Sequence, residues 1–267
     1  RKFGDTHLGQ KELIGFGSFT QPIADFMRAC VMARKNIIIS GGTGSGKTTL
    51  LNLLAHYIPE HERILTIEDA AELRLPQTHW ISLEARPANV EGKGQVSIRD
   101  LFRNALRMRP DRIVIGECRG PESLDMLQAM NTGHEGSLTT VHANSPRDVV
   151  SRLDSMVLMS NIELPIEALH EMIASAVHLV VHTGRLSDGS RKILSISELT
   201  GIKTQTEVAF QDLFAFRQTG VESDGKVVGE FHPTGHLPTF LEELKVKGIP
   251  LDEAMFRAPD AAPTRNG

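Results

Sequence analysis

Residues 41–48 read Gly41-Gly42-Thr43-Gly44-Ser45-Gly46-Lys47-Thr48, and this short stretch decides the fold. It fits the pattern G-x-x-x-x-G-K-[ST], in which glycines let the backbone wrap an anion with its N–H groups. The apolar run 37–39 before it predicts a buried parallel strand, and the leucine-rich stretch 48–57 after it predicts a helix. The positive end of that helix faces the same anion. The alternative is a flexible glycine-rich loop without a ligand, which is disfavoured because strand, loop and helix follow in the required order.

We expect this loop to bind ATP together with Mg²⁺. Lys47 supplies a point charge for the β- and γ-phosphates, and Thr48 offers a hydroxyl to the metal ion. The expected nucleotide-binding residues are Gly42, Thr43, Gly44, Ser45, Gly46, Lys47, Thr48 and Thr49. Hydrolysis needs further groups, which must orient or deprotonate the attacking water.

Acidic residues follow two of the predicted strands. Glu117 ends the apolar strand 112–116, and Glu68 ends the strand 63–67, with Asp69 and Glu72 shortly after it. Ligands of open parallel sheets gather at the carboxyl ends of the strands. We therefore expect Glu117 to hold Mg²⁺ with Thr48, and Glu68 and Glu117 to arrange metal and water. The alternative of solvated loop residues stays open, most of all for Asp69 and Glu72.

Two histidines flank the predicted strand 137–141. His142 ends this strand and could sense the γ-phosphate through a hydrogen bond, whereas His134 precedes it. Either histidine could instead be structural, with its ring bonded to the backbone. A zinc site is not expected, because no suitable spacing of metal ligands surrounds either residue.

Arginines crowd one predicted helix and its exit. Arg103 and Arg107 are spaced i, i+4 and share a face of that helix. Phosphoryl transfer often uses an arginine to stabilise the transferring group, sometimes from a neighbouring subunit. The other reading is a solvated helix face paired with Asp100 or Asp111, and the residues alone favour it.

The remaining pattern predicts an α/β fold with a mainly parallel sheet, because strands alternate with helices along the chain. Ser97 and Asp100 form a capping box that opens one of these helices. Turns at 187–189 and 223–225 indicate hairpins between antiparallel strands. We expect a linker and entry helix over 1–33, the ATPase core over 34–200, a small antiparallel hairpin and helix appendage over 201–257, and a disordered tail over 258–267.

Composition narrows the classes of function. The 267 residues carry a formal net charge of −4 and 5% aromatic residues, which gives no global basic field for nucleic acid. The two cysteines, Cys30 and Cys118, form no disulfide framework and exclude a four-cysteine zinc module. No apolar run is long enough to span a bilayer, and no signal peptide opens the sequence. The chain starts at Arg1, so we expect it to be a fragment of something longer.

Four segments in order resemble the Walker A, Asp box, Walker B and His box of the secretion ATPase superfamily, which drives type II and type IV secretion and type IV pili. The segments are Gly41–Thr48, Thr66–Leu73, Gly116–Gly120 and Gly133–Asn144. Three further stretches look like the CpaF-type branch of Tad/Flp pilus ATPases. They are Arg86–Gly94, Leu106–Asp111 and Asp212–Gly220.

This resemblance implies a RecA-like motor that works as a cytoplasmic homohexamer, peripheral to the inner membrane. The implied partner is an inner-membrane pilus or secretion platform protein, and no nucleic acid is expected. Glu68 matches the Asp-box glutamate and Glu117 the Walker B glutamate, both linked to water activation and Mg²⁺. His134 and His142 match the His box, and Arg103 and Arg107 match arginines that approach the phosphates.

Two departures from the superfamily qualify the resemblance. Its N-terminal domain is missing from this sequence, and the tetracysteine region of the type II branch is absent, which argues against that branch. Two other functions stay open: a hexameric nucleic-acid motor, which uses the same core, and a nucleotide-binding switch with little turnover.

Overall fold

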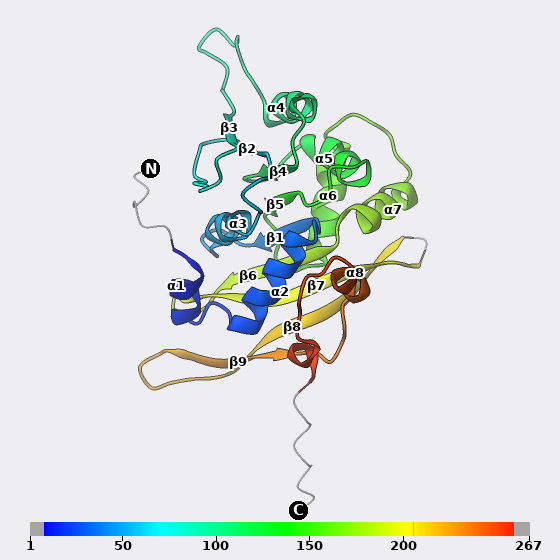
Figure 1. The fold of residues 1–267 in the computed structure, drawn as a ribbon. Coiled ribbons are helices and arrows are strands. Elements are labelled where there is room, and N and C mark those ends of the chain that lie inside the picture. The colour runs from blue at the N-terminus through cyan, green and yellow to red at the C-terminus, as the bar shows by residue number, and fades with distance from the viewer. Residues whose placement is uncertain (1–7, 205, 259–267) are drawn as a thin grey trace, which may run out of the picture.

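A computed structural model describes residues 8–204 and 206–258 and shows one nine-stranded sheet with helices on both faces (Figure 1). The strands follow one another across the sheet in the order β3-β2-β4-β5-β1-β6-β7-β8-β9. Their bounds are β1 (Ile37–Gly41), β2 (Ile64–Glu68), β3 (Trp80–Glu84), β4 (Arg112–Ile115), β5 (Leu138–Val141), β6 (Leu179–Arg185), β7 (Arg191–Thr204), β8 (Glu207–Val221) and β9 (Val227–Pro233). The expected α/β fold with a mainly parallel sheet is confirmed.

Alternate residues of β1 pack into two different apolar layers, one on each face of the sheet. Ile37 and Ile39 belong to the cluster that contains α2 (Gln21–Met32) and α3 (Lys47–His56). Ile38 belongs to the opposite cluster, which contains the helices α4 (Ile98–Ala105), α5 (Glu122–Asn131), α6 (Asp148–Leu158) and α7 (Ile166–Ala176). Because both faces of the strand are covered, its sequence is apolar throughout rather than alternating.

Short elements complete the described part of the chain. They are α1 (Gln10–Gly15), the 3₁₀ turns η1 (Leu106–Met108) and η2 (Glu253–Phe256), and α8 (Leu241–Val246). The capping box expected at the start of α4 is present, since Ser97 and Asp100 satisfy each other's backbone N–H groups. No helix in the described ranges combines the length and the apolar character needed to cross a membrane.

The expected antiparallel C-terminal strands are confirmed, and they continue the main sheet. The boundary expected between residues 200 and 201 falls inside β7, which pairs with β6, and β8 and β9 continue the same sheet. Phe214 of β8 packs its ring 5.5 Å from Phe26 of α2 and 5.3 Å from Phe256. The C-terminal strands therefore belong to the core of the fold. The expected hairpin turns at 187–189 and 223–225 are confirmed, as backbone bonds close both.

The ends of the chain are described only in part. The expected entry helix is α2, whereas residues 1–7 of the expected linker lie outside the described residues. The expected tail over 258–267 lies outside them from residue 259 onward.

Asn36 ties three strands together where they begin. Its side chain accepts hydrogen bonds from the N–H groups of Gly136 and Ser137 before β5, and it donates to the Ala176 carbonyl before β6. Its backbone N–H donates to Nδ1 of His178 at 3.1 Å. The buried amide thereby satisfies backbone groups of two distant segments, which would otherwise be costly to bury.

The lowered pKa of His178 predicts that the free energy of unfolding depends on pH. Burial, followed by the nearby Lys35 ammonium, lowers the pKa of His178 from 6.5 to about 4. The unfolded chain therefore takes up a proton between pH 6.5 and 4 that the folded chain does not. His178 thus contributes stability that is present above pH 6.5 and lost as the pH falls toward 4.

His178→Gln keeps an acceptor for the Asn36 N–H group but cannot titrate. We expect urea unfolding at pH 7 and pH 4.5 to show a smaller loss of stability on acidification for this variant than for the parent chain. His61→Gln, at an exposed histidine, is the matched control and should keep the parent slope. Equal slopes for all three proteins would contradict the prediction.

Candidate functional site

The glycine-rich loop lies at the carboxyl end of β1 and is braced by β6. Gly41 has φ +152°, and a Cβ there would lie 2.3 Å from the Thr183 carbonyl oxygen, so only glycine fits. The Ser45 hydroxyl lies 2.9 Å from the Thr183 hydroxyl, which donates to the Ser40 carbonyl at 3.0 Å. This arrangement fixes the loop between two strands, in the position where the backbone N–H groups of such a loop can bind an anion.

Lys47 begins α3 and turns its ammonium back into the loop. Its Nζ donates to the Gly42 carbonyl at 2.9 Å, and the residue is half-buried. Burial lowers the pKa of Lys47, and the Glu117 carboxylate opposes that shift. Thr48 and Thr49 follow in the first turn of the helix, both partly exposed. Positive charge and backbone donors thus converge on one position, as a polyphosphate requires.

Glu68 is a buried carboxylate at the end of β2. Its Oε1 accepts hydrogen bonds from the N–H groups of Glu72 and Leu73, both at 3.0 Å, while its buried Oε2 has no partner in the described structure. Burial raises the pKa of this carboxyl. A Cβ on Gly116 would lie 2.9 Å from the Glu68 Cγ, so the glycine leaves the space that Glu68 fills. The orphaned oxygen is therefore available to a water molecule or a cation.

Glu117 follows β4 at the same edge of the sheet. Its side chain forms an ion pair with Arg119, whose Nη1 also lies 3.5 Å from Asp69. The hydrogen bond to Glu117 raises the pKa of Arg119. Sequence reasoning did not single out Arg119, although it lies only two residues after the expected metal ligand. Its position there is the signal that could have found it.

The donor set at this edge fits Mg²⁺. That ion takes oxygen ligands, keeps several waters and uses one or two carboxylates together with substrate phosphates. The Thr48 hydroxyl, the Glu117 carboxylate and the unpartnered Oε2 of Glu68 supply such oxygens. In the described ranges no three His, Cys, Asp or Glu side chains converge on one metal position.

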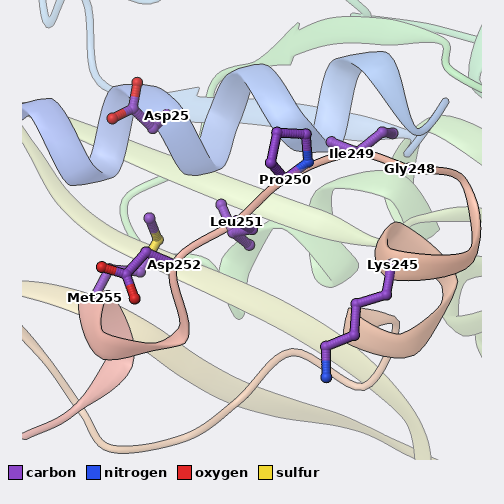
Figure 2. A pocket seen from close by; sticks show the side chains of 8 residues that line it. All are labelled: Asp25, Lys245, Gly248, Ile249, Pro250, Leu251, Asp252 and Met255. Atoms are coloured by element: carbon purple, nitrogen blue, oxygen red, sulfur yellow. The ribbon is translucent and has the colours of Figure 1, made fainter.

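Two of the surface hollows bear on where the site lies, and one of them borders Glu117. A hollow of about 540 Å³ is lined by Glu117 and Arg119 and by the segments 85–87 and 95–98. A larger groove of about 760 Å³ lies between α2 and the chain after α8, where Figure 2 shows Ile249, Leu251 and Met255 among its lining residues. Neither hollow is lined by residues of the glycine-rich loop. We place the site at the smaller one because Glu117, which lines it, is close enough to Lys47 to oppose the lowering of that residue's pKa.

Parallel pairing brings one of the two histidines to the loop. Val141 of β5 lies opposite Ser40 of β1, so His142 is exposed directly beside the glycine-rich loop. His134 precedes β5 and lies at the opposite, amino edge of the sheet. The structure therefore gathers Glu68, Glu117 and His142 around the loop and leaves His134 apart.

Arg103 and Arg107 are not brought to the loop of their own chain. Arg103 lies on α4 and donates through Nε to Asp125 of α5 at 2.9 Å. Arg107 is exposed in η1, which leads back toward the amino end of β4. Both belong to the face of the sheet opposite α3. Their expected contact with phosphates remains a prediction, and within one chain the geometry gives it no support.

One arginine that sequence reasoning missed does reach the loop. Arg191, the first residue of β7, donates through Nε to the Gly44 carbonyl at 2.9 Å. The two residues are 147 positions apart, and no local pattern marks Arg191. Only the pairing of β6 and β7 beside β1 reveals this contact.

Comparison with known proteins agrees with this geometry. A family model described as type II/IV secretion system protein matches residues 1–223. A putative conjugal transfer protein of Mycobacterium tuberculosis is 44% identical over 187 residues, which cover 70% of this chain and 53% of that protein. The type IV secretion system protein PtlH of Bordetella pertussis is 42% identical over 172 residues, covering 63% and 51%.

A solved structure shares the fold. The crystal structure of the VirB11 ATPase from the Brucella suis type IV secretion system, in complex with sulphate, superimposes with a TM-score of 0.60 at 31% identity. The match covers 74% of this chain and 65% of that one. The present chain spans about half the length of the two curated relatives.

The contact between Gly116 and Glu68 gives a testable prediction. Gly116→Ala forces its new Cβ against the Glu68 Cγ and should lower the free energy of unfolding by about 1–3 kcal/mol. Gly15→Ala is the matched control, since a Cβ there meets nothing within 4 Å and should cost nothing. Urea denaturation measures both.

A double variant identifies the cause. Glu68→Ala removes the atoms that clash, so the Gly116→Ala change should cost less in that background than in the parent chain. An equal cost in both backgrounds would show that the two residues are not coupled.

Proposed function

The chain belongs to the type II/IV secretion system protein family, and from that membership we propose that it is a motor ATPase that powers pilus assembly or protein secretion. The observation that carries the proposal is the meeting of three groups at one edge of the sheet. Lys47 and the loop amides supply positive charge, while Glu68 and Glu117 supply carboxylates beside them. Phosphoryl transfer to water needs this combination of charge and positioning.

The residues divide the work as follows. Loop amides and Lys47 hold the β- and γ-phosphates in place. Thr48 and Glu117 would hold Mg²⁺, which would neutralise charge that develops on the phosphates. Glu68 and Glu117 orient the attacking water. Glu68 is suited to this because its buried Oε2 has no hydrogen-bond partner in the described structure. His142 lies beside the loop and reports the presence of the γ-phosphate through a hydrogen bond.

We infer that Arg103 and Arg107 act on a neighbouring subunit. Both lie on the face of the sheet opposite α3, so within one chain they are turned away from the loop. In a homohexamer, an arginine from an adjacent copy can stabilise the transferring phosphate. Hydrolysis then changes the contact between subunits and moves a partner.

The proposed partner is a pilus or secretion platform protein of the inner membrane, with the motor cytoplasmic and peripheral to that membrane. We place the chain in the CpaF-type Tad/Flp branch on the strength of the segments Arg86–Gly94, Leu106–Asp111 and Asp212–Gly220. Because α2 packs against β8 and the antiparallel strands share one sheet with β1, we propose that residues 21–257 work as one unit.

Two substitutions test the activity. Lys47→Ala should abolish ATP binding, because the loop loses its only lysine charge. Glu117→Gln should keep ATP binding but lower kcat by about 100-fold or more. Glu91→Gln, an exposed acid on the segment before α4, is the control and should leave kcat unchanged. Nucleotide titration measures the loss of ATP binding, and the rate of phosphate release measures the fall in kcat.

Three outcomes would redirect the proposal. Full turnover by Glu117→Gln would remove this glutamate from the chemistry. Turnover stimulated by single-stranded DNA, with a steep dependence on salt, would indicate a nucleic-acid motor. Tight ATP binding without turnover in the assembled protein would indicate a switch.

A further inference from the structure

The β6–β7 hairpin carries two arginines past the edge of the sheet. β6 pairs with β1 as far as Gly41, opposite Thr183, and the hairpin continues beyond this point. Arg185 and Arg191 form a cross-strand pair, so they lie directly opposite each other on one face of the hairpin. Like charges in this position destabilise a hairpin unless an anion lies between or beside them.

Nothing in the described part of the protein neutralises this pair. Neither arginine forms an ion pair there, and both are exposed. The nearby acid, Asp188, uses both oxygens elsewhere, accepting from the N–H groups of Ser190 at 2.8 Å and Val227 at 2.9 Å. Two cationic side chains therefore remain without a carboxylate partner.

Arg191 lies across the glycine-rich loop. Its Nε donates to the Gly44 carbonyl, and its Cδ lies 3.4 Å from where a Cβ on Gly46 would be. Arginine has five N–H donors, and only this one has a protein partner in the described structure. The terminal nitrogens remain for a ligand that the loop holds.

The order of the strands tells which end of a nucleotide this arginine meets. The loop follows β1, with Glu68 and Glu117 on the β2–β4 side and the two arginines on the β6–β7 side. The carboxylates arrange water and metal, so the γ-phosphate lies on their side. The opposite end of the triphosphate must then lie toward β6 and β7.

We propose that Arg191, assisted by the charge of Arg185, binds the α-phosphate end of the nucleotide, an inference that rests on the proposed function. Arg185 turns its guanidinium toward the hairpin turn at Gly189, so it contributes charge more than contact. Because ATP and ADP share the α-phosphate, this arginine holds substrate and product alike. It sets nucleotide affinity and leaves the chemical step to the carboxylates.

Calorimetry on the full chain tests the proposal with MgATP, MgADP and magnesium pyrophosphate. Arg191→Gln should weaken the binding of ATP and the binding of ADP by the same factor, about tenfold. A loss of this size is typical of a lost hydrogen bond to a charged group. Arg185→Gln should weaken the binding of both nucleotides about twofold to threefold, because only a charge is lost. Arg217→Gln, an exposed arginine of β8, is the matched control and should bind as the parent does.

Pyrophosphate separates nucleotide contact from a role in shaping the loop. It lacks the nucleoside end, so Arg191→Gln should bind it as the parent does, whereas a distorted loop would bind it more weakly. Unchanged nucleotide affinity, a loss confined to ATP, or an equal loss for pyrophosphate would each overturn the proposal. A parent chain that binds neither nucleotide would overturn the proposed function as well, and that result is distinct from the other three.

Discussion

The structure depends on the burial of β1 in the middle of its sheet. Both faces of the strand are covered by helices, and both edges pair in parallel, with β5 and β6. The glycine-rich loop continues from the carboxyl end of this buried strand. The loop, the carboxylates and the arginines all meet there, because parallel pairing aligns their strands at that end.

The two sides of this opening differ in charge. Carboxylates arrive from β2 and β4 on one side, and arginines arrive from β6 and β7 on the other, with Lys47 between them. The two ends of a polyphosphate that binds across the loop would therefore face groups of opposite charge. The order of strands, rather than any single residue, decides which end of the opening carries the carboxylates and which carries the arginines.

Local patterns were sufficient to predict the elements and the centre of the site. The apolar run 37–39, the capping box at Ser97 and the turns at 187–189 each depend on neighbours in sequence, and each was confirmed. Glu68 and Glu117 could be placed at the loop because parallel strands share an edge. Their roles in catalysis stay predictions.

The remaining features depend on contacts that no local pattern records. Turn residues predict the hairpins after β6 but not which edge of the sheet they join, and the boundary expected between residues 200 and 201 falls inside β7. Helical spacing placed Arg103 and Arg107 on one face of α4, yet it could not show that α4 and α3 lie on opposite faces of the sheet. Arg191 contacts the loop across 147 residues of sequence.

Asn36 also imposes an order on assembly. Its partners in Gly136 and Ala176 lie 100 and 140 residues further along the chain. While the chain emerges from the ribosome, β1 and the glycine-rich loop are made early, but their amide ladder cannot close until residues near 180 have appeared. The strand that leads into the glycine-rich loop therefore gains both of its neighbouring strands only after residues near 180 have been made.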